Sequence, residues 1–362
     1  MPRYASSIDV ARLAGVSQSA VSRAFTPGAS VSKTTRKKVL EAAAKLGYQP
    51  SLIPQIMLNH RSNLVAVVIG ELYNPCYWMV LQFFLERLKE SGRQVLLVNV
   101  ESGHFLDATI PRLAGYRVDA IVSTLPLHAP EAADELARFK IPVVLFNNSV
   151  KNAWISSVSC DNRPAGRQVA ELFVSKGAQS FAYVAGAQDS PASDERLSGF
   201  SERLRELGMK PATIYGGDFR YEGGRTAAAT MVKLKAKDGV PDAIFCGNDL
   251  MAFGVKDYLV GDAGLNVPRD VMIMGFDNIP SSDWGTYGIS TFSEGAENMV
   301  AKAVSEVERI AHHPEQGMGE HFVVPTRLIE RASTNRPVIR ALPPGQATTS
   351  PLLVASPVAD DS

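Results

Sequence analysis

The sequence has few cysteines and no long apolar run. Its three cysteines, Cys76, Cys160 and Cys246, are far apart and odd in number, so they provide neither a disulfide framework nor a Cys-x-x-Cys metal pair. No stretch reaches the roughly 18–20 apolar residues that a membrane span needs, and the N-terminal residues lack the apolar segment of a secretory signal. We therefore expect a soluble, reduced, cytoplasmic protein.

The sequence also lacks the common motifs of catalysis and cofactor binding. It contains no GxGxxG, GxxxxGK[ST], HExxH or GxSxG, and none of its six histidines has the spacing of a metal-ligand pair. We expect no catalytic residue, no metal site and no cofactor. The protein is therefore not expected to be an enzyme.

Charge is unevenly distributed along the 362 residues, although the formal net charge is zero. Residues 1–62 carry nine lysines and arginines against two acidic residues, a balance of +7, which leaves −7 on the remaining 300 residues. The chain is 45% hydrophobic and 20% charged, so it can bury a sizeable core in two or three domains. A small basic head on a larger acidic body indicates that the head alone binds a polyanion.

Three short helices are predicted in the head. Ser7 is the expected N-cap of a helix over residues 7–14, Ser17 caps a second helix over residues 18–25, and Ser32 caps a longer third helix. Two short helices joined by a tight glycine-containing turn and supported by a third make a helix-turn-helix. The second helix of such a motif fits the major groove of DNA.

The second helix is expected to turn a polar face outward, because Val21, Ala24 and Phe25 share its inner face. Arginine suits guanine and glutamine suits adenine, while hydroxyls near helix starts and lysines suit phosphates. The alternative is a solvated helical bundle with surplus lysines. The predicted DNA contacts in the head are Ser7, Ser17, Gln18, Ser19, Ser22, Arg23, Ser32, Thr34 and Lys37.

Two runs, DVARLAGVSQSAVSRAF and VSKTTRKKVLEAAAKLGYQPS, resemble the N-terminal domain of the lactose-repressor (LacI/GalR) family of bacterial transcription regulators. The resemblance implies that Gln18, Ser19 and Arg23 read bases. Through the motifs ERLSGF, GNDLMAFG and MGFDNIP it extends over about residues 5–336.

Residues 51–62 (SLIPQIMLNHRS) join the head to the body. The resemblance implies a hinge helix that folds on DNA and inserts an apolar side chain, here Met57, into the minor groove. With Ser51 as N-cap, Pro54 falls in the first turn, where no intrahelical N–H bond is required. The alternative is an ordinary flexible linker.

From residue 64 onward, apolar runs alternate with amphipathic stretches. This α/β pattern predicts two lobes with parallel sheets covered by helices on both faces. The predicted strands are residues 64–70, 94–100, 120–124 and 142–147 in one series, and 180–186, 212–218, 243–248 and 271–277 in the other.

The resemblance implies that the body, residues 63–338, is two-lobed like a periplasmic binding protein. The chain is expected to cross between the lobes near Asp161, near residues 287–292 and near residues 322–324. Residues 1–50 are then the helix-turn-helix head and residues 51–62 the hinge. Lobe 1 is about 63–160 and 291–322, lobe 2 about 161–290 and 323–338, and the Pro/Ser/Ala-rich residues 339–362 a disordered tail.

Open α/β sheets bind ligands at the carboxyl ends of their strands, where several polar residues of this chain fall. Aromatic faces suit the C–H face of a sugar, and arginine and aspartate each pair with two adjacent hydroxyls. A planar ligand such as a purine would also fit between aromatics, and the same residues could be core aromatics or helix caps. The resemblance implies effector contacts at Tyr77, Trp78, Asn147, Asp161, Ser190, Arg196, Phe219, Asn248 and Asp277.

Together these features predict a sequence-specific DNA-binding transcriptional repressor. Its partners would be a second copy of the chain, a pseudo-palindromic operator in double-stranded DNA and a small metabolite, with a carbohydrate favoured, bound between the lobes. The alternatives are a sugar-binding protein, or an α/β enzyme with an attached DNA-binding domain.

Overall fold

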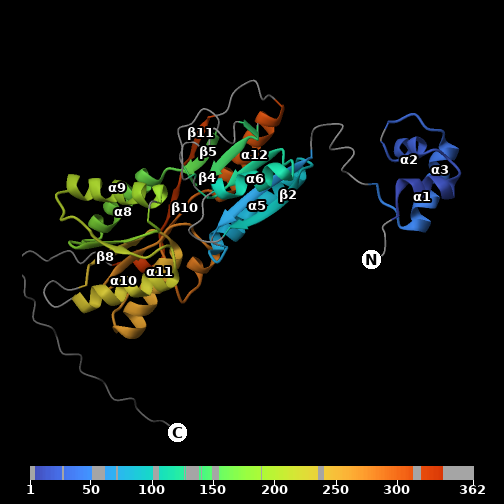
Figure 1. Cartoon of the computed structure of the whole chain (residues 1–362). Helices are drawn as coiled ribbons and strands as arrows, with labels where there is room; N and C mark the ends of the chain where they lie inside the picture. The colour runs from blue at the N-terminus through green and yellow to red at the C-terminus, as the bar shows by residue number, and fades with distance from the viewer. Residues whose placement is uncertain are drawn as a thin grey trace, which may run out of the picture.

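The structure is a computed structural model. It describes residues 5–26, 28–50, 62–70, 72–100, 106–125, 127, 138–139, 141–148, 155–188, 190–234, 240–312 and 319–336. Within these ranges, a head of helices precedes a body of two α/β lobes (Figure 1). Residues 51–61 of the predicted hinge, with Pro54 and Met57, and the predicted C-terminal tail lie outside the described residues.

The head consists, among the described residues, of the helices α1 (Ser7–Ala14), α2 (Gln18–Phe25) and α3 (Lys33–Leu46). Their contact surfaces are small and apolar, with Val10, Val21 and Val39 fully buried at the centre. These three helices agree with the predicted helix-turn-helix.

The N-caps of α2 and α3 are Ser17 and Ser32, as predicted, and each hydroxyl accepts a backbone N–H of the first turn. The prediction that Ser7 caps α1 is wrong by one residue. Ser6 is the cap: its hydroxyl accepts the N–H of Asp9, and the Asp9 carboxylate accepts the N–H of Ser6 at 2.9 Å. Asp9 stands three positions after Ser6, the spacing of a reciprocal capping box, and this decides between the two serines.

Lobe 1 is built on a six-stranded parallel sheet with the order β11-β5-β4-β3-β1-β2 in the described part of the chain. Alternate residues of β1 point to opposite faces, so Val65 and Val67 face α5 and α12 while Ala66 and Val68 face α6. The elements are β1 (Leu64–Gly70), α5 (Pro75–Glu90), β2 (Gln94–Val100), η1 (Leu106–Thr109), α6 (Ile110–Gly115), β3 (Ala120–Ser123), β4 (Val143–Phe146), β5 (Ile155–Cys160), α12 (Ala296–His312) and β11 (His321–Val324).

Lobe 2 has a four-stranded parallel sheet with the order β7-β6-β8-β9, again among the described residues. Helices α8 and α9 lie on one face and α10 and α11 on the other (Figure 1). Its elements are α8 (Asn162–Ser175), β6 (Phe181–Ala185), α9 (Pro191–Glu206), β7 (Thr213–Gly216), α10 (Tyr221–Leu234), β8 (Ala243–Cys246), α11 (Asp249–Asp257), a π turn (Tyr258–Asp262), β9 (Met272–Met274) and η3 (Pro280–Asp283).

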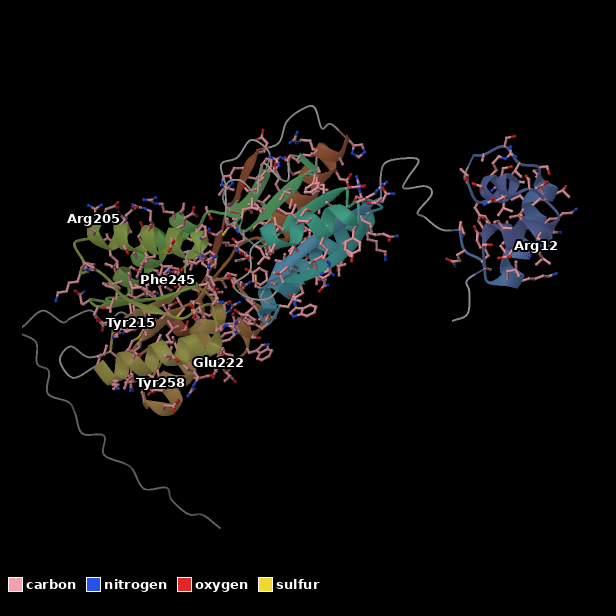
Figure 2. All side chains as sticks on the ribbon, in the orientation of Figure 1. Arg12, Arg205, Tyr215, Glu222, Phe245 and Tyr258 are labelled. Carbon is pink, nitrogen blue, oxygen red and sulfur yellow. The ribbon has the colours of Figure 1, made fainter. Side chains whose placement is uncertain are left out.

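Aromatic side chains fill the centre of lobe 2. Phe245 is fully buried and lies edge to face against Tyr183 and Phe200, with ring centroids 5.2 and 5.5 Å away. Figure 2 shows Phe245 inside the lobe, whereas Arg205 and Glu222 lie on its surface. The two parallel sheets with helices on their faces confirm the predicted fold class.

The chain passes between the lobes at three segments within the described residues: after β5, between β9 and α12, and after β11. The second and third segments pair through the antiparallel strands β10 (Thr291–Ser293) and β12 (Arg327–Ile329), and η5 (Ala332–Thr334) follows. The first and third are joined by the Asp161 Oδ1 atom, which accepts the N–H of Thr326 at 2.6 Å.

Asp249, at the start of α11, is buried beside the second crossing segment. Its carboxylate accepts hydrogen bonds from the Ile279 N–H and from the hydroxyls of Ser282 and Thr291, at 3.0, 2.6 and 2.7 Å. Burial raises the pKa of Asp249 to about 6, although these donors oppose the shift. Asp249 therefore fastens α11 to the segment that leads into lobe 1.

A largely buried ion-pair network holds the last residue of the predicted hinge and the residue after it. The Asp119 carboxylate accepts the N–H groups of Ser62 and Asn63 at 2.8 and 3.0 Å. The guanidinium of Arg93 donates to Asp119 at 2.8 Å and, through two nitrogens, to Glu308 near the end of α12 at 2.9 and 3.0 Å. The entry to lobe 1 is thus joined to α12.

No helix among the described residues is long and apolar enough to cross a membrane.

Glycines allow α8 and α9 to touch backbone to backbone. A Cβ atom on Gly166 would lie 2.2 Å from the carbonyl oxygen of Arg196, and one on Gly199 would lie 2.0 Å from that of Arg163. Both distances are too short for any side chain, so the close approach requires glycine. This packing fixes the part of α9 that carries Arg196.

We predict that Gly199→Ala lowers the free energy of unfolding by about 2 kcal/mol or more, because the helices must separate to admit the methyl group. Gly115→Ala is the matched control, since a Cβ there meets no atom within 4 Å. The control should change stability by less than about 1 kcal/mol. Urea denaturation measures both, and equal effects of the two substitutions would contradict the prediction.

Candidate functional site

The outer face of α2 is polar and exposed. Ser17, Gln18, Ser19, Ser22 and Arg23 all lie on the surface of the head. Several of these side chains are already ordered by neighbours within the head: Gln18 Nε2 donates to Ser7 Oγ at 2.9 Å, and Arg23 Nε donates to the Ser19 carbonyl at 3.3 Å. The helix thus presents exposed hydrogen-bonding groups on its outer face, with Gln18 held by Ser7 of α1.

The predicted phosphate contacts on α3 lie at its N-terminal end. Ser32, Thr34 and Lys37 are exposed there. Arg36 on the same helix has a structural role, since its Nη1 donates to the Ala24 carbonyl at 2.8 Å and holds α3 against the end of α2. A helix N-terminus with exposed hydroxyls and a lysine is suited to a phosphate group.

A second candidate site contains residues from both lobes. We call Cys76, Arg196, Asp277 and Glu294 the interlobe cluster. The Cys76 Sγ atom and carboxylate oxygens of Asp277 and Glu294 lie within 4.8 Å of one another. Cys76 lies in the first turn of α5, Arg196 on α9, Asp277 after β9 and Glu294 just before α12.

Arg196 is fixed within lobe 2. It is 2% exposed, its Nε donates to Asn162 Oδ1 at 2.8 Å, and its Nη1 donates to the Gly247 carbonyl. Its guanidinium carbon lies 3.4 Å from the centre of the Phe276 ring. These contacts tie Arg196 to the start of α8, to the residue after β8 and to Phe276.

The pKa values of the acidic groups in the interlobe cluster are raised by burial, and those of Asp277 and Cys76 also by neighbouring carboxylates. Burial and the charge of Glu294 raise the pKa of Asp277, while Arg196 and a hydrogen bond from the Asn74 side chain oppose the shift. Burial also raises the pKa of Glu294, again against the field of Arg196. The pKa of the Cys76 thiol is raised by burial and by both carboxylates, so Cys76 is a neutral donor to Glu294 Oε1 at 3.3 Å.

Three of the predicted effector contacts have backbone conformations that are rare for non-glycine residues. Asn147, Phe219 and Asp277 have φ angles of 56°, 58° and 105°, and each follows the end of a parallel strand. Strained residues of this kind persist where surrounding structure holds them, and they concentrate at functional sites. The Phe219 ring lies so close over Gly186 that a Cβ there would be 2.0 Å from Cζ.

Other predicted effector contacts make structural hydrogen bonds. Asn248 is the N-cap of α11: its Oδ1 accepts the Met251 N–H and its Nδ2 donates to the Phe219 carbonyl, both at 3.0 Å. Ser190 is the N-cap of α9. Both side chains are thus helix caps, whereas Asp161, for which the sequence left a capping role open, precedes α8 without a side-chain hydrogen bond to its first turn.

The two predicted aromatic contacts on α5 differ in exposure. Tyr77 is half-buried against the body core, whereas Trp78 is 55% exposed. Asn147 also differs from Asn248, because its Oδ1 is buried without a hydrogen-bond partner among the described residues.

The sequence did not single out Asn74, Asn162 or Glu294, and it considered Cys76 only as a possible disulfide or metal ligand. Asn74 is the N-cap of α5 and also hydrogen-bonds Asp277 in lobe 2, so one side chain joins the lobes. Nothing local distinguishes Glu294 from a surface residue in the sequence. Cys76, Asp277 and Glu294 form the group of side chains in the described structure that could hold a metal ion, although the neutral thiol is a poor ligand.

Comparisons with known proteins identify the family of the chain. Residues 8–51 match the model of "Bacterial regulatory proteins, lacI family", and residues 170–334 match the model of "Periplasmic binding protein-like domain". Catabolite control protein A of Priestia megaterium is 31% identical over 274 residues, 75% of this chain and 81% of that protein. The chain belongs to the lacI family of bacterial regulatory proteins. As a lacI-family member it is a transcriptional regulator, which confirms the resemblance found in the sequence.

Other lacI-family proteins cover more of the chain. The HTH-type transcriptional repressor PurR of Pasteurella multocida is 27% identical over 313 residues, 85% of this chain and 92% of that protein. The lac repressor dimer bound to operator and the anti-inducer ONPF has a TM-score of 0.81 at 23% identity, covering 92% and 99% of the two chains, and shows the common fold. The CelR–cellobiose complex has a TM-score of 0.67 at 27% identity, covering 91% and 99%.

We predict that Asn74→Asp lowers the free energy of unfolding of this lacI-family regulator, and that the loss depends on pH. Aspartate can still cap α5, but it adds a carboxylate beside Asp277 and Glu294. At pH 8 the free energy of unfolding should fall by about 1–3 kcal/mol, and at pH 5 by less, because protonation relieves the repulsion.

Asn74→Ser is the control, since serine caps the helix without adding charge. Its effect should be the same at both pH values. Urea denaturation at pH 5 and pH 8 measures these effects. If the loss of unfolding free energy in Asn74→Asp does not grow with pH, Asn74 does not lie near the two carboxylates.

Proposed function

We propose that this regulator is a dimeric repressor whose affinity for operator DNA is set by a small polyhydroxylated metabolite, a sugar or sugar derivative, bound at the interlobe cluster. The observation that supports this proposal best is that one chain combines two features. Its basic head has an exposed polar helix face, and its body has a cluster of charged groups contributed by both lobes. We further propose that the protein acts in the cytoplasm and catalyses no reaction.

The proposal for the head is that α2 enters the major groove, with Gln18, Ser19 and Arg23 reading bases. The exposure of these side chains and the fold of the head support it. Ser7, Ser17, Ser22, Ser32, Thr34 and Lys37 then contact bases or phosphates around the same groove. The role proposed for Met57, insertion into the minor groove, rests on the family resemblance.

The proposal of a dimer is supported by apolar side chains exposed on lobe 1. Leu85 on α5 is 47% exposed, and Leu97 on the edge strand β2 is 43% exposed. Large apolar groups gathered on neighbouring elements indicate a surface that another chain covers. A two-fold dimer formed through this surface would place two heads on the two halves of a palindrome.

The proposal for the effector is that it contacts Arg196 and Asp277, with Tyr77, Trp78, Asn147, Phe219 and the crossing residue Asp161 around it. A ligand that binds one angle between the lobes more tightly than another shifts the population of the two states. Typical couplings of about 1–3 kcal/mol suffice to change operator affinity roughly 5- to 150-fold. The CelR–cellobiose complex, a relative bound to a sugar, supports this class of ligand.

The head is tested by selecting an operator for the full-length chain from a random duplex library and measuring binding by fluorescence anisotropy. We predict that Arg23→Ala weakens operator binding roughly 5- to 150-fold and leaves binding to random DNA nearly unchanged. Lys37→Ala is the matched comparison, and it should weaken both alike and lower the log–log salt slope by about 0.9. Sequence preference that survives in Arg23→Ala would exclude Arg23 as a base-reading residue.

The effector site is tested by a thermal-shift screen of the full-length chain against sugars, sugar acids, polyols and nucleosides, followed by operator binding with each hit. Asp277→Asn should lower the affinity for the hit by about tenfold or more and leave operator affinity without ligand unchanged. Asp262→Asn, which changes an exposed carboxylate on lobe 2, is the control and should respond as the unsubstituted chain does. A full response in Asp277→Asn would place the ligand elsewhere.

A further inference from the structure

The interlobe cluster holds more buried negative than positive charge. It contains the carboxylates of Asp277 and Glu294, and Glu294 is 1% exposed. Arg196 is the basic side chain whose charge acts on both carboxylates. When both carboxylates are ionised, one negative charge in the cluster is left without a counter-charge.

Arg196 does not satisfy these carboxylates through its hydrogen bonds. Its Nε donates to Asn162 and its Nη1 to the Gly247 carbonyl, and its flat face lies on Phe276. These contacts hold the guanidinium in place, so it acts on Asp277 and Glu294 mainly through its field. A pair of carboxylates, one buried and one half-buried, with one fixed cation favours a second cation.

One oxygen of Glu294 also lacks a donor. Its Oε1 accepts the Cys76 thiol, whereas its Oε2 is buried and has no hydrogen-bond partner among the described residues. Burying an acceptor without a donor is unfavourable, and more so when the acceptor is charged. Glu294 belongs to the same three-residue group as Asp277, and one carboxylate oxygen of each lies within 4.8 Å of the other, so one small donor group could contact both side chains.

We propose that the effector carries a protonated amine, as an amino sugar or another aminated polyol does, and that Asp277 and Glu294 bind this ammonium group. The inference rests on the proposed function, which assigns the effector to the interlobe cluster. An ammonium group offers three N–H donors and one positive charge, which match the unpaired oxygen and the missing counter-charge.

Other ligand classes fit the cluster less well. The hydroxyl of a neutral sugar can donate to Glu294 but leaves the charge excess in place. A phosphorylated or acidic sugar would add a further negative charge beside two carboxylates. A metal ion would take Cys76 as a thiolate, yet its thiol is fully buried, neutral and engaged as a donor to Glu294.

The test uses pairs of probes that differ in the amine. Tris(hydroxymethyl)aminomethane is compared with 1,1,1-tris(hydroxymethyl)ethane, and D-glucosamine with D-glucose, by titration calorimetry on the full-length chain at neutral pH in an amine-free buffer of constant ionic strength. We expect the amine of at least one pair to bind roughly tenfold to a hundredfold more tightly than its neutral partner. Equal or tighter binding of the neutral partner in both pairs, or no binding by either amine, would overturn the proposal.

Glu294→Gln removes the charge and keeps the shape. Its amide oxygen can still accept the Cys76 thiol, so we expect the fold to be retained and the preference for the amine to be lost. Glu297→Gln is the matched control, because the Glu297 side chain lies three residues away, is 62% exposed and pairs with Arg87. The control should keep the full preference. An amine preference that survives in Glu294→Gln, or Zn²⁺ binding that depends on Cys76 and replaces amine binding, would contradict the proposal.

The outcomes separate this inference from the proposed function. If a neutral sugar or a nucleoside changes operator affinity and Asp277→Asn removes the effect, the proposed function is supported and the inference that the effector carries an amine is wrong. If an amine binds and changes operator affinity through Glu294, both stand. If no small molecule in either screen changes operator affinity, both fail.

Discussion

Hydrogen bonds to two carboxylates, one half-buried and one buried, tie down the segments through which the chain passes between its lobes. Asp161 binds the backbone of Thr326, and Asp249 binds Ile279, Ser282 and Thr291, so crossings far apart in sequence are joined side by side. In the proposed function, a ligand that favours one angle between the lobes would act through these joined segments.

The features that depend on local sequence were predictable. The strands of both lobes follow from short runs of β-branched residues, and the caps Ser17 and Ser32 follow from a serine before a helical pattern. The error at α1 is instructive, because Ser6 and Ser7 are equally good caps in isolation. The position of Asp9, which completes a reciprocal box only with Ser6, decides between them.

The interlobe cluster could be predicted only in part. Asp277 and Arg196 were expected from the family resemblance, but the contact between Cys76 and Glu294 joins residues 218 positions apart and depends on the tertiary fold. The role of Asn248 could not be predicted either. A polar residue at the end of a strand suits either a ligand or a helix cap, and only the structure shows that both ends of its amide are engaged.

Helix α12 gives the cluster a direct mechanical connection to the start of the body. Glu294 lies two residues before the 17-residue helix, and Glu308 near its other end accepts hydrogen bonds from Arg93. Arg93 also donates to Asp119, which binds the backbone of Ser62 and Asn63. A helix of this length is a stiff rod of about 25 Å. A tilt of the helix axis by about 5° at one end would move the other end by about 2 Å. Helix α12 would thus transmit a small displacement at the proposed effector site to the residues where the chain enters lobe 1.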